Sequence, residues 1–318
     1  MNADFEMELA ALAGGDTYRR THTFAALNQR LAPHLLWLAS PGDALLLEET
    51  WPETLTRDAA RCGVELILRV AAKRQPERIF TPWGWTPGVV RLGESLGARL
   101  PHVSLETVQR VNSKLWSHAL EEELGVAMPG AAVAADFAEL EEAVRRACPR
   151  ADDKWVIKSP FGFAARERVL GRGARLEGAQ ATWARRQFAR SGVKLIFQPW
   201  LERVREYGVT LEIKADGEIN LCGISDLQTN GAGTGTGYLL GRTIDSRERT
   251  AELERLAQTV GARLFREGYT GPAGVDALEH TKGLHPLLEI NARYTMGFVA
   301  LAIERALKPQ TPTLWKLK

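Results

Sequence analysis

The sequence predicts an open α/β domain followed by a larger α+β region. In the first ~105 residues, short apolar runs alternate with stretches of helical spacing, the pattern of strands and helices in turn. Further along, the turn Ala215-Asp216-Gly217 joins two apolar runs, which predicts a pair of antiparallel strands. We therefore expect residues 1–107 to form a small open α/β domain and the rest of the chain to combine hairpins with helices.

The elements expected in the first domain follow from its apolar spacing. Residues 35–39 and 44–47 are short apolar runs, which predict buried strands. Residues 54–72 carry Leu, Ala, Val and Ile at helical spacing and predict a helix. Residues 78–81 predict a strand that runs into a Trp/Pro/Gly turn, and residues 89–96 predict the helix after it.

Capping residues place the first helices of the second region. Asn112 or Ser113 can cap a helix over residues 114–124, because their side chains accept hydrogen bonds from the first free backbone N–H groups. Asp136 can do the same for a helix over residues 137–148. Both helices end in residues that stop a helix, glycine in the first case and proline in the second.

The remaining elements are predicted from shorter patterns. Residues 154–158 form an apolar run between two lysines that is rich in strand formers, so they predict a strand. The other expected elements are a loop over 159–173, a helix over 180–191, strands over 195–198, 207–213, 218–224 and 287–291, and helices over 246–267 and 299–307.

Composition excludes several classes of protein. Hydrophobic residues make up 45% of the 318 residues and charged residues 25%, which is ordinary for a globular protein with a sizeable core. The net charge of +2 gives no reason to expect a nucleic-acid partner. No apolar run approaches the ~18 residues of a membrane span, and the acidic amino terminus lacks a signal-peptide pattern. Three widely spaced cysteines suggest neither a disulfide framework nor a zinc site, so we expect a cytoplasmic protein.

Several well-known catalytic motifs are missing. The sequence contains no G-x-x-x-x-G-K-[ST], which excludes a P-loop enzyme, and no H-E-x-x-H or G-x-S-x-G. The glycine-rich run over residues 231–237 has Thr236 where a dinucleotide-binding G-x-G-x-x-G needs its third glycine.

Two carboxylates and an amide are grouped near the end of the chain. Glu289 lies 13 residues after Asp276 and ends an apolar strand, with Asn291 two residues further on. Glu289 and Asn291 share one strand face, and a hairpin of this length can place Asp276 opposite them. Such a set of hard oxygen ligands suits Mg²⁺. By itself the segment fits equally well a pair of edge-strand carboxylates in water.

The order and spacing of these three residues resemble the metal-binding end of the ATP-grasp superfamily. Members of this superfamily hold ATP between two α+β subdomains. The resemblance covers residues 108–308 and implies one subdomain with a flap over residues 108–200 and a second with the metal site over residues 201–318. Residues 1–107 then stand where such proteins carry a pre-ATP-grasp domain, so the expected fold is an ATP-grasp fold preceded by a small open α/β domain.

Two lysines and a loop resemble the phosphate-binding elements of the superfamily. Lys114 resembles the first lysine of the superfamily's site, on the helix that begins the fold, and Lys158 resembles the second, at a strand end. The loop over residues 159–168, which contains Gly162, is similar in place and glycine content to the flexible flap. Two lysines from different elements can neutralise phosphate oxygens, and backbone N–H groups of a flap can cover them.

The adenosine-binding residues are also implied by the resemblance. The hinge strand that contacts adenine through its backbone is similar to Gln198, Pro199, Trp200 and Leu201. Gln198 stands where the superfamily usually has glutamate. Glu206 resembles the glutamate that holds the ribose hydroxyls, but the spacing from the hinge is about one residue longer than usual, so Glu202 remains an alternative.

Arginines are the expected groups for the γ-phosphate or a substrate carboxylate, since a guanidinium pairs with both in a bidentate way. Some ligases of the superfamily carry an arginine two residues before the metal aspartate, where this chain has Gly274. Arg293 is the expected substitute. Arg168 on the flap is a second catalytic candidate, together with Arg166 and Arg242.

The resemblance implies an ATP-dependent carboxylate–amine ligase that forms an amide through an acylphosphate. It implies ATP with Mg²⁺, which Mn²⁺ can replace, and small-molecule or amino-acid substrates. The segment over residues 226–241 is expected to close over the acceptor. Two alternatives stay open: a non-catalytic ATP-binding regulator, and a kinase or carboxylase. Homodimers are common in the superfamily, and we expect no nucleic-acid or membrane partner.

Overall fold

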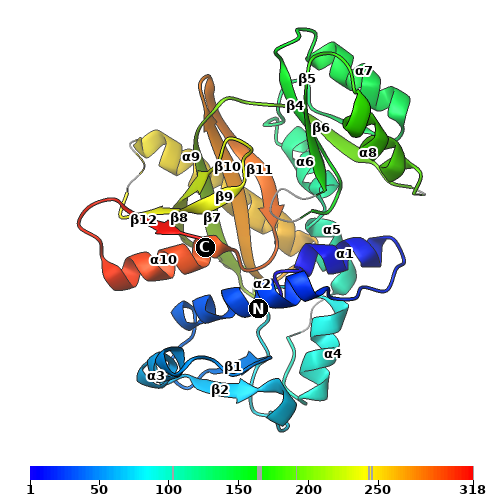
Figure 1. Ribbon diagram of the computed structural model, residues 1–318. Coiled ribbons are helices and arrows are strands. Elements are labelled where there is room, and N and C mark those ends of the chain that lie inside the picture. Colours follow the sequence, from blue (N-terminus) through cyan, green and yellow to red (C-terminus); the bar gives the residue numbers. More distant parts are fainter. Residues whose placement is uncertain (102–103, 163–166, 191, 243, 245, 318) are drawn as a thin grey trace.

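A computed structural model of the chain describes all residues except 102–103, 163–166, 191, 243, 245 and 318. The described strands form three sheets, of two, four and six strands, which follow one another along the chain (Figure 1). No helix in this part of the chain combines the length and apolarity needed to cross a bilayer.

The amino-terminal region contains a small parallel sheet. Strand β1 (Ala44–Leu47) pairs in parallel with β2 (Glu65–Leu68), and α3 (Glu53–Arg61) connects them, so the expected βαβ unit is present. Helix α4 (Pro87–Ser95) follows, as predicted, with Thr86 as its cap. The other elements of this region are α1 (Phe5–Ala13), α2 (His22–Leu31) and the short 3-10 helices η1 (Ala32–Trp37) and η2 (Arg69–Ala71).

Three predictions for this region were wrong. The expected strand over residues 35–39 belongs largely to η1, which begins next to Pro33. The expected helix over residues 54–72 ends early because Gly63 adopts a positive φ of 68°, and the chain then enters β2. The expected strand over residues 78–81 makes only an isolated bridge between Ile79 and Arg99.

The middle region is a four-stranded antiparallel sheet with helices on one face. Its strands run in the order β3 (Ala132–Ala134), β6 (Leu195–Pro199), β4 (Lys154–Lys158) and β5 (Arg168–Arg172). Trp155 and Ile157 pack against α7 (Phe137–Ala147) and α8 (Gly178–Phe188) in a fully buried cluster. Side chains alternate along a strand, so the other face of β4 presents Val156 and Lys158.

Strand β5 corrects the expected loop over residues 159–173. Its residues pair in register with β4, Arg168 opposite Lys158 and Arg172 opposite Lys154. The capping predictions here were confirmed: Ser113 caps α6 (Lys114–Glu123), and Asp136 caps α7 by accepting from the Glu139 N–H. The loop after β4 is thus shorter than predicted, and residues 163–166 of the predicted flap lie outside the described part of the chain.

The carboxy-terminal region is built on a six-stranded antiparallel sheet. The strand order is β11 (Gly283–Asn291), β10 (Gly271–His280), β7 (Arg203–Ile213), β8 (Ile219–Thr229), β9 (Gly235–Leu240) and β12 (Thr313–Lys316). Helix α9 (Arg247–Arg266) and helix α10 (Met296–Leu307) cover opposite faces. In α9, Gly261 lies against Leu211, whereas in α10 Gly297 lies against Thr210, the neighbouring residue on β7.

The amino-terminal helix α1 belongs to the core of this large sheet. Phe5 and Leu9 are buried in the same cluster as Val209 and Val275 of β7 and β10. Helix α5 (Leu105–Val111) contributes to the same cluster. The first residues of the chain therefore pack next to the end of β11 (Figure 1).

Candidate functional site

The two predicted metal carboxylates lie side by side on the large sheet. In the β10–β11 hairpin, Asp276 is directly opposite Glu289, and Gly274 is opposite Asn291. Across β7, Asp276 pairs with Gly208, where an added Cβ would lie 3.0 Å from Ser225 Oγ and 3.9 Å from Asp276 Oδ1. The hairpin register thus brings together three residues that the sequence spacing had grouped.

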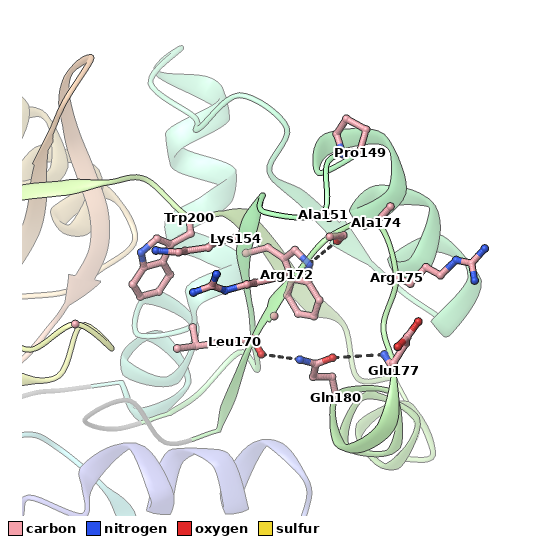
Figure 2. A pocket seen from close by; sticks show the side chains of 14 residues that line it. Pro149, Ala151, Lys154, Leu170, Arg172, Ala174, Arg175, Glu177, Gln180 and Trp200 are labelled. Atoms are coloured by element: carbon pink, nitrogen blue, oxygen red, sulfur yellow. Dashed lines mark hydrogen bonds between the residues drawn. The ribbon is translucent and has the colours of Figure 1, made fainter.

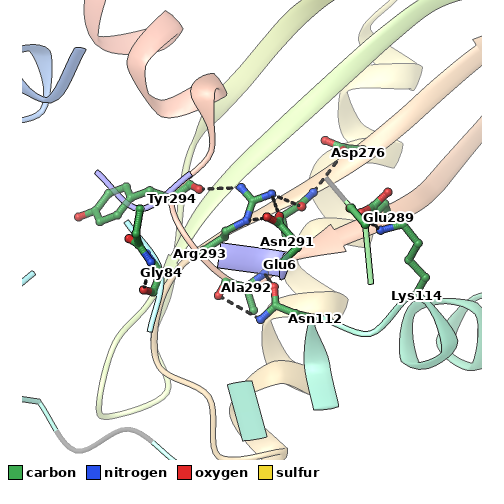
Figure 3. A network of polar contacts seen from close by, with 12 residues as sticks. Glu6, Gly84, Asn112, Lys114, Asp276, Glu289, Asn291, Ala292, Arg293 and Tyr294 are labelled. Carbon is green, nitrogen blue, oxygen red and sulfur yellow. Dashed lines mark hydrogen bonds and ion pairs between the residues drawn. The ribbon is translucent and has the colours of Figure 1, made fainter. Parts of the chain in front are cut away.

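Lys114 connects this sheet to the four-stranded one. It is the first residue of α6, and its Nζ lies 2.7 Å from Glu289 Oε1 and 3.2 Å from the Gly162 carbonyl oxygen. Its backbone N–H donates to the Pro160 carbonyl oxygen at 2.9 Å. Lys114 therefore holds the beginning of the flap next to a predicted metal ligand (Figure 3).

Lys158 lies at the end of β4 and faces the same carboxylate. Its pKa is lowered to about 8. Burial is the main cause, and the nearby Lys114 and Arg168 act in the same direction, whereas Glu289 opposes them. Arg168, opposite Lys158 in the β4–β5 register, donates through Nη2 to the Ala232 carbonyl oxygen of the glycine-rich loop. This contact joins β5 to the glycine-rich loop between β8 and β9. Lys158 and Arg168 of the four-stranded sheet therefore both lie near Glu289 of the six-stranded sheet.

The environments of the two carboxylates push their pKa values apart. Burial raises the pKa of Asp276 to about 7, and the neighbouring Glu289 raises it as well. Burial also raises the pKa of Glu289, but Lys114 and Lys158 outweigh it and hold that pKa below its ordinary value. Glu289 is thus the ionised member of the pair at neutral pH, while Asp276 is close to half-protonated.

Arg293 is held by a carboxylate from the other end of the chain. Its Nε lies 2.8 Å from Glu6 Oε1, and its Nη2 donates to the same oxygen. Nη2 also donates to Asn291 Oδ1 at 3.0 Å, and Nη1 donates to the Tyr294 carbonyl oxygen at 2.9 Å. In this arrangement protein acceptors use most of the guanidinium donors predicted to bind phosphate or substrate.

Asn291 presents its nitrogen, not its oxygen, to the predicted metal position. Asn291 Nδ2 donates to Asp276 Oδ2 at 3.1 Å, while Oδ1 accepts from Arg293. The assignment of the amide is well defined, because an acceptor lies on one side and a donor on the other. Gly274 lies against Thr295, whose Cγ2 would be 2.7 Å from a Cβ at this position. An arginine at residue 274 therefore does not fit.

The predicted hinge continues from β6 toward β7. Pro199 is opposite Trp155 and Gln198 opposite Val156 on β4. The Trp200 N–H donates to the Lys154 carbonyl oxygen at 2.8 Å. Within the described residues, the Leu201 backbone N–H donates to no backbone acceptor. In the same part of the chain, Gln198 Oε1 is buried and accepts no hydrogen bond.

The two candidates for the ribose differ in burial. Glu206 is 8% exposed and lies on the same face of β7 as Gly208. Its Oε1 accepts from Arg203 Nη1 at 2.6 Å and from Thr229 Oγ1 at 2.7 Å. Glu202 is exposed and precedes the strand. Arg203 also stacks on Trp200 of the hinge, 4.2 Å from the ring centroid.

The donor set fits a hard divalent cation. Asp276 and Glu289 offer carboxylate oxygens from adjacent strands, and Mg²⁺ is commonly held by one or two carboxylates plus phosphate oxygens and water. Among the described residues, no group of three or more His, Cys, Asp or Glu side chains is arranged as a metal cage. A cation here would therefore need further ligands, which nucleotide phosphates can supply.

Several polar neighbours of the site have no signal in the sequence. Tyr238 on β9 is 7% exposed, and burial and the nearby Asp276 raise its pKa. Beneath Lys158, the buried His118 and His285 each lie 3.7 Å from Glu121 Oε2. Glu6, Tyr238 and His285 have no motif spacing, because contacts between distant segments bring them to the site, whereas His118 and Glu121 are three residues apart on α6. Arg166 lies outside the described residues, and Arg242 follows β9.

A cavity of about 870 Å³ opens at the edge of the four-stranded sheet, away from the two carboxylates. Lys154, Arg172 and Trp200 line it (Figure 2), together with Gly231 in the turn between β8 and β9. Of the predicted site residues that the structure describes, Trp200 alone lines this cavity. The convergence of charged side chains, and not this cavity, defines the candidate site.

Comparison of the sequence with family models and with curated proteins finds no match. Solved structures, however, share the fold. N5-carboxyaminoimidazole synthetase from Staphylococcus aureus, complexed with ADP, has 12% identity and a TM-score of 0.52 over 81% of this chain and 72% of that chain. N5-carboxyaminoimidazole ribonucleotide synthetase from Thermus thermophilus has 18% identity and a TM-score of 0.54 over 84% of this chain and 70% of that chain.

A third neighbour is D-alanyl-alanine synthetase A from Vibrio cholerae, with 11% identity and a TM-score of 0.57 over 84% of this chain and 93% of that chain. The chain thus shares its overall architecture with these structures. The chain has the ATP-grasp fold, preceded by a small α/β region.

Proposed function

We propose that the chain is an ATP-dependent ligase that joins a carboxylate to an amine with release of ADP and phosphate. One observation carries the proposal. Lys114 at the start of α6 and Lys158 at the end of β4 both lie close enough to Glu289 of β11 to lower its pKa, and Lys114 Nζ is 2.7 Å from Glu289 Oε1, with Asp276 directly opposite on β10. Cations for phosphate oxygens and carboxylates for a metal ion are the two groups that phosphoryl transfer needs at one place.

The nucleotide would lie between the two sheets. The Leu201 N–H would contact the adenine, and Glu206, which is buried on the cleft face, would hold the ribose in preference to the exposed Glu202. Lys114, Lys158 and backbone groups near Gly162 would neutralise and cover the phosphates. Structures that share the fold contain ADP in one case and MgADP with bicarbonate in another, which supports this use of the cleft.

Asp276 and Glu289 would hold Mg²⁺ or Mn²⁺, with Asn291 beside them. The cation would offset charge on the transferred phosphoryl group. Arg168, opposite Lys158 on β5, would contact the γ-phosphoryl group. The proposed substrates are a small-molecule or amino-acid carboxylate and an amine. The proposed subdomains are residues 108–200 and 201–318, and residues 226–241 would lie beside the acceptor.

The proposed chemistry needs no nucleophilic side chain. A substrate carboxylate oxygen attacks the γ-phosphorus, the bond to the bridging oxygen breaks, and ADP leaves. The amine nitrogen then attacks the acyl carbon of the acylphosphate, phosphate leaves, and the nitrogen loses a proton. The acylphosphate is required because a free carboxylate is a poor electrophile, and positioning with charge neutralisation accounts for the rate.

The test is release of ADP against a panel of carboxylates, each with and without added amines. A ligase releases ADP only with a suitable pair and yields an amide by mass spectrometry. Glu289→Gln should abolish this release while the protein stays folded. If no carboxylate elicits ADP release from the wild type, the proposal is wrong and a nucleotide-binding regulator is favoured.

Bicarbonate belongs in the same panel. A neighbour with a TM-score of 0.51 is a biotin carboxylase domain in complex with MgADP and bicarbonate, which favours a carboxylase as the second candidate function. A carboxylated product, or a phosphorylated product that no amine displaces, would identify a carboxylase or a kinase.

A further inference from the structure

The amino-terminal helix contributes a buried carboxylate to the candidate metal site. Glu6 and Arg293 form an ion pair whose side chains are only 8% and 12% exposed. Both Nε and Nη2 of Arg293 donate to the same oxygen, Glu6 Oε1 (Figure 3). Removing either partner of such a buried pair would leave an uncompensated charge in the interior, which is strongly destabilising.

A chain of hydrogen bonds leads from this pair to a predicted metal ligand. Arg293 Nη2 donates to Asn291 Oδ1 at 3.0 Å, and Asn291 Nδ2 donates to Asp276 Oδ2 at 3.1 Å. The guanidinium therefore fixes the amide, and the amide fixes one oxygen of the carboxylate. Outer groups that orient metal ligands in this way affect metal affinity strongly.

Helix α1 is anchored at several points, so Glu6 is a fixed group. Asp4 accepts from Arg20 Nε at 2.7 Å, and Glu8 Oε1 accepts from the Gly88 N–H at 2.6 Å. Phe5 lies against Gly84, where an added Cβ would be 2.4 Å from the ring. These contacts hold α1 against the start of α4 and the turn before it, and keep Glu6 directed at Arg293.

The position of Arg293 makes the neutralising role of Glu6 important. The guanidinium is close enough to Asp276 and Glu289 to lower the pKa of both carboxyls. Without Glu6, a nearly buried cation would remain next to two carboxylates and would pair with them. A divalent cation would then have to compete with the guanidinium for the same oxygens.

We propose that Glu6 is a positioning residue for the metal site, which holds Arg293 on Asn291 and away from Asp276 and Glu289. The inference rests on the proposed function in that it takes Asp276 and Glu289 as metal ligands. It assigns to α1 a role in metal binding that lies outside the expected ATP-grasp segment of residues 108–308.

Binding of Mn²⁺ in the presence of ADP, followed by electron paramagnetic resonance of the free ion, measures this directly. The wild type is compared with Glu6→Gln and with Glu6→Asp. Glu6→Gln removes the charge and should weaken Mn²⁺ binding about tenfold. Glu6→Asp retains the charge on a shorter side chain and should recover part of the loss.

Glu8→Gln is the matched control. It removes the charge of another buried carboxylate on the same helix, and the glutamine oxygen can still accept from Gly88. Its Mn²⁺ affinity should stay within a factor of about two of the wild type, since no chain of contacts leads from Glu8 to Asp276 within the described residues. Thermal melting by circular dichroism establishes that each variant is folded.

A double-mutant comparison tests whether Glu6 acts through Arg293. In an Arg293→Met background the competing guanidinium is absent, so adding Glu6→Gln should not weaken Mn²⁺ binding further. This background also removes the buried unpaired cation, so the comparison stands even if Glu6→Gln alone does not fold. An equal loss of affinity in both backgrounds would overturn the inference, as would a folded Glu6→Gln that binds Mn²⁺ like the wild type.

Glu289→Gln separates this inference from the proposed function. If Glu289→Gln loses Mn²⁺ and Glu6→Gln does not, the metal site stands and the role of Glu6 is wrong. If Glu289→Gln binds Mn²⁺ as well as the wild type does, the metal site itself is misplaced and both ideas fail. Absence of ligase turnover with intact Mn²⁺ binding would contradict the proposed function alone.

Discussion

At the scale of single residues, the site is organised by an unequal pair of carboxylates. Asp276 and Glu289 are opposite each other on adjacent strands, yet their pKa values move in opposite directions. The lysines approach Glu289, whereas Asp276 receives only an amide N–H from the described residues. The pair therefore takes up a proton, on Asp276, as the pH falls below neutrality, and a cation that binds there would have to displace it.

We expect metal affinity to depend on pH around neutrality. Burial and Glu289 raise the pKa of Asp276 to about 7, so below pH 7 the carboxyl is protonated and cannot ligate. Mn²⁺ affinity with ADP should therefore fall by up to about tenfold per pH unit below pH 7 and level off above it. Isothermal titration from about pH 5.5 to about pH 8.5 checks this, a range that spans the expected transition on both sides.

The nucleotide phosphate also titrates in this range, so the Mn²⁺ affinity of free ADP must be measured in parallel and subtracted. In Asp276→Asn the remaining dependence on pH should match that of free ADP. A wild-type profile no steeper than that of free ADP would show that Asp276 does not ligate the metal.

We expect Lys158 to bind phosphate oxygens of the nucleotide rather than to stabilise the folded protein. Its desolvated ammonium has a pKa of about 8 because burial outweighs the attraction of the nearby carboxylates. Lys158→Met should weaken ADP binding by about 1.5–3 kcal/mol, the usual range for a hydrogen bond to a charged group. Fluorescence titration measures the change.

Lys154→Met on the same strand is the matched control, because Lys154 is exposed and begins β4, whereas Lys158 ends it. Its effect on ADP affinity should be less than about threefold. Equal losses in the two variants would point to general electrostatic attraction instead of a phosphate contact.

At the scale of elements, the β4–β5 hairpin depends on a glycine. A Cβ at Gly171 would lie 2.0 Å from Cζ2 of the fully buried Trp155. Gly171→Ala should therefore destabilise the fold by about 1–3 kcal/mol through overpacking. Gly231→Ala is the control, since nothing lies within 4 Å of its Cβ position among the described residues. Urea unfolding compares them, and equal midpoints for the two variants would contradict this packing.

Sequence patterns predicted the elements that carry their own local signals. The helices over residues 114–123 and 137–147 were identified because Ser113 and Asp136 cap them through local hydrogen bonds. Strand β5 escaped prediction because its polar and glycine residues look like a loop, and only pairing with β4 makes it a strand. The apolar run over residues 35–39 misled for the converse reason, since none of the described strands pairs with it.

The same distinction applies to the site. Spacing along the β10–β11 hairpin grouped Asp276 with Glu289, and the register confirmed that they are opposite. No spacing could predict that Glu6 would bind Arg293, or that Tyr238 would lie near Asp276. Those contacts depend on how α1 and β9 pack, which the sequence near each residue does not determine.

At the scale of the whole molecule, direct contacts join the two larger sheets. Lys114 of α6 binds both Glu289 of β11 and the Gly162 carbonyl oxygen after β4, and Arg168 of β5 donates to Ala232 in the turn between β8 and β9. A nucleotide with its metal would add contacts to both sides at once. At about 100 times its Kd, MgADP should raise the free energy of unfolding by about 2.7 kcal/mol.

Chemical denaturation with and without MgADP measures this stabilisation, which Glu289→Gln should largely remove. Glu218→Gln is the control, because it breaks only an exposed ion pair with Lys214. Stabilisation that persists undiminished in Glu289→Gln would place the nucleotide away from the carboxylates.

The ion pair between Glu6 and Arg293 also sets an order of events during synthesis. The two residues are 287 positions apart, so helix α1 leaves the ribosome long before its partner is made. At ~5–20 residues per second, the delay is about 15–60 s. Until β7 and β10 have also been made, Phe5 and Leu9 lack the strands against which they are buried. The helix that carries Glu6 therefore waits for most of the chain to be made before its buried residues are covered.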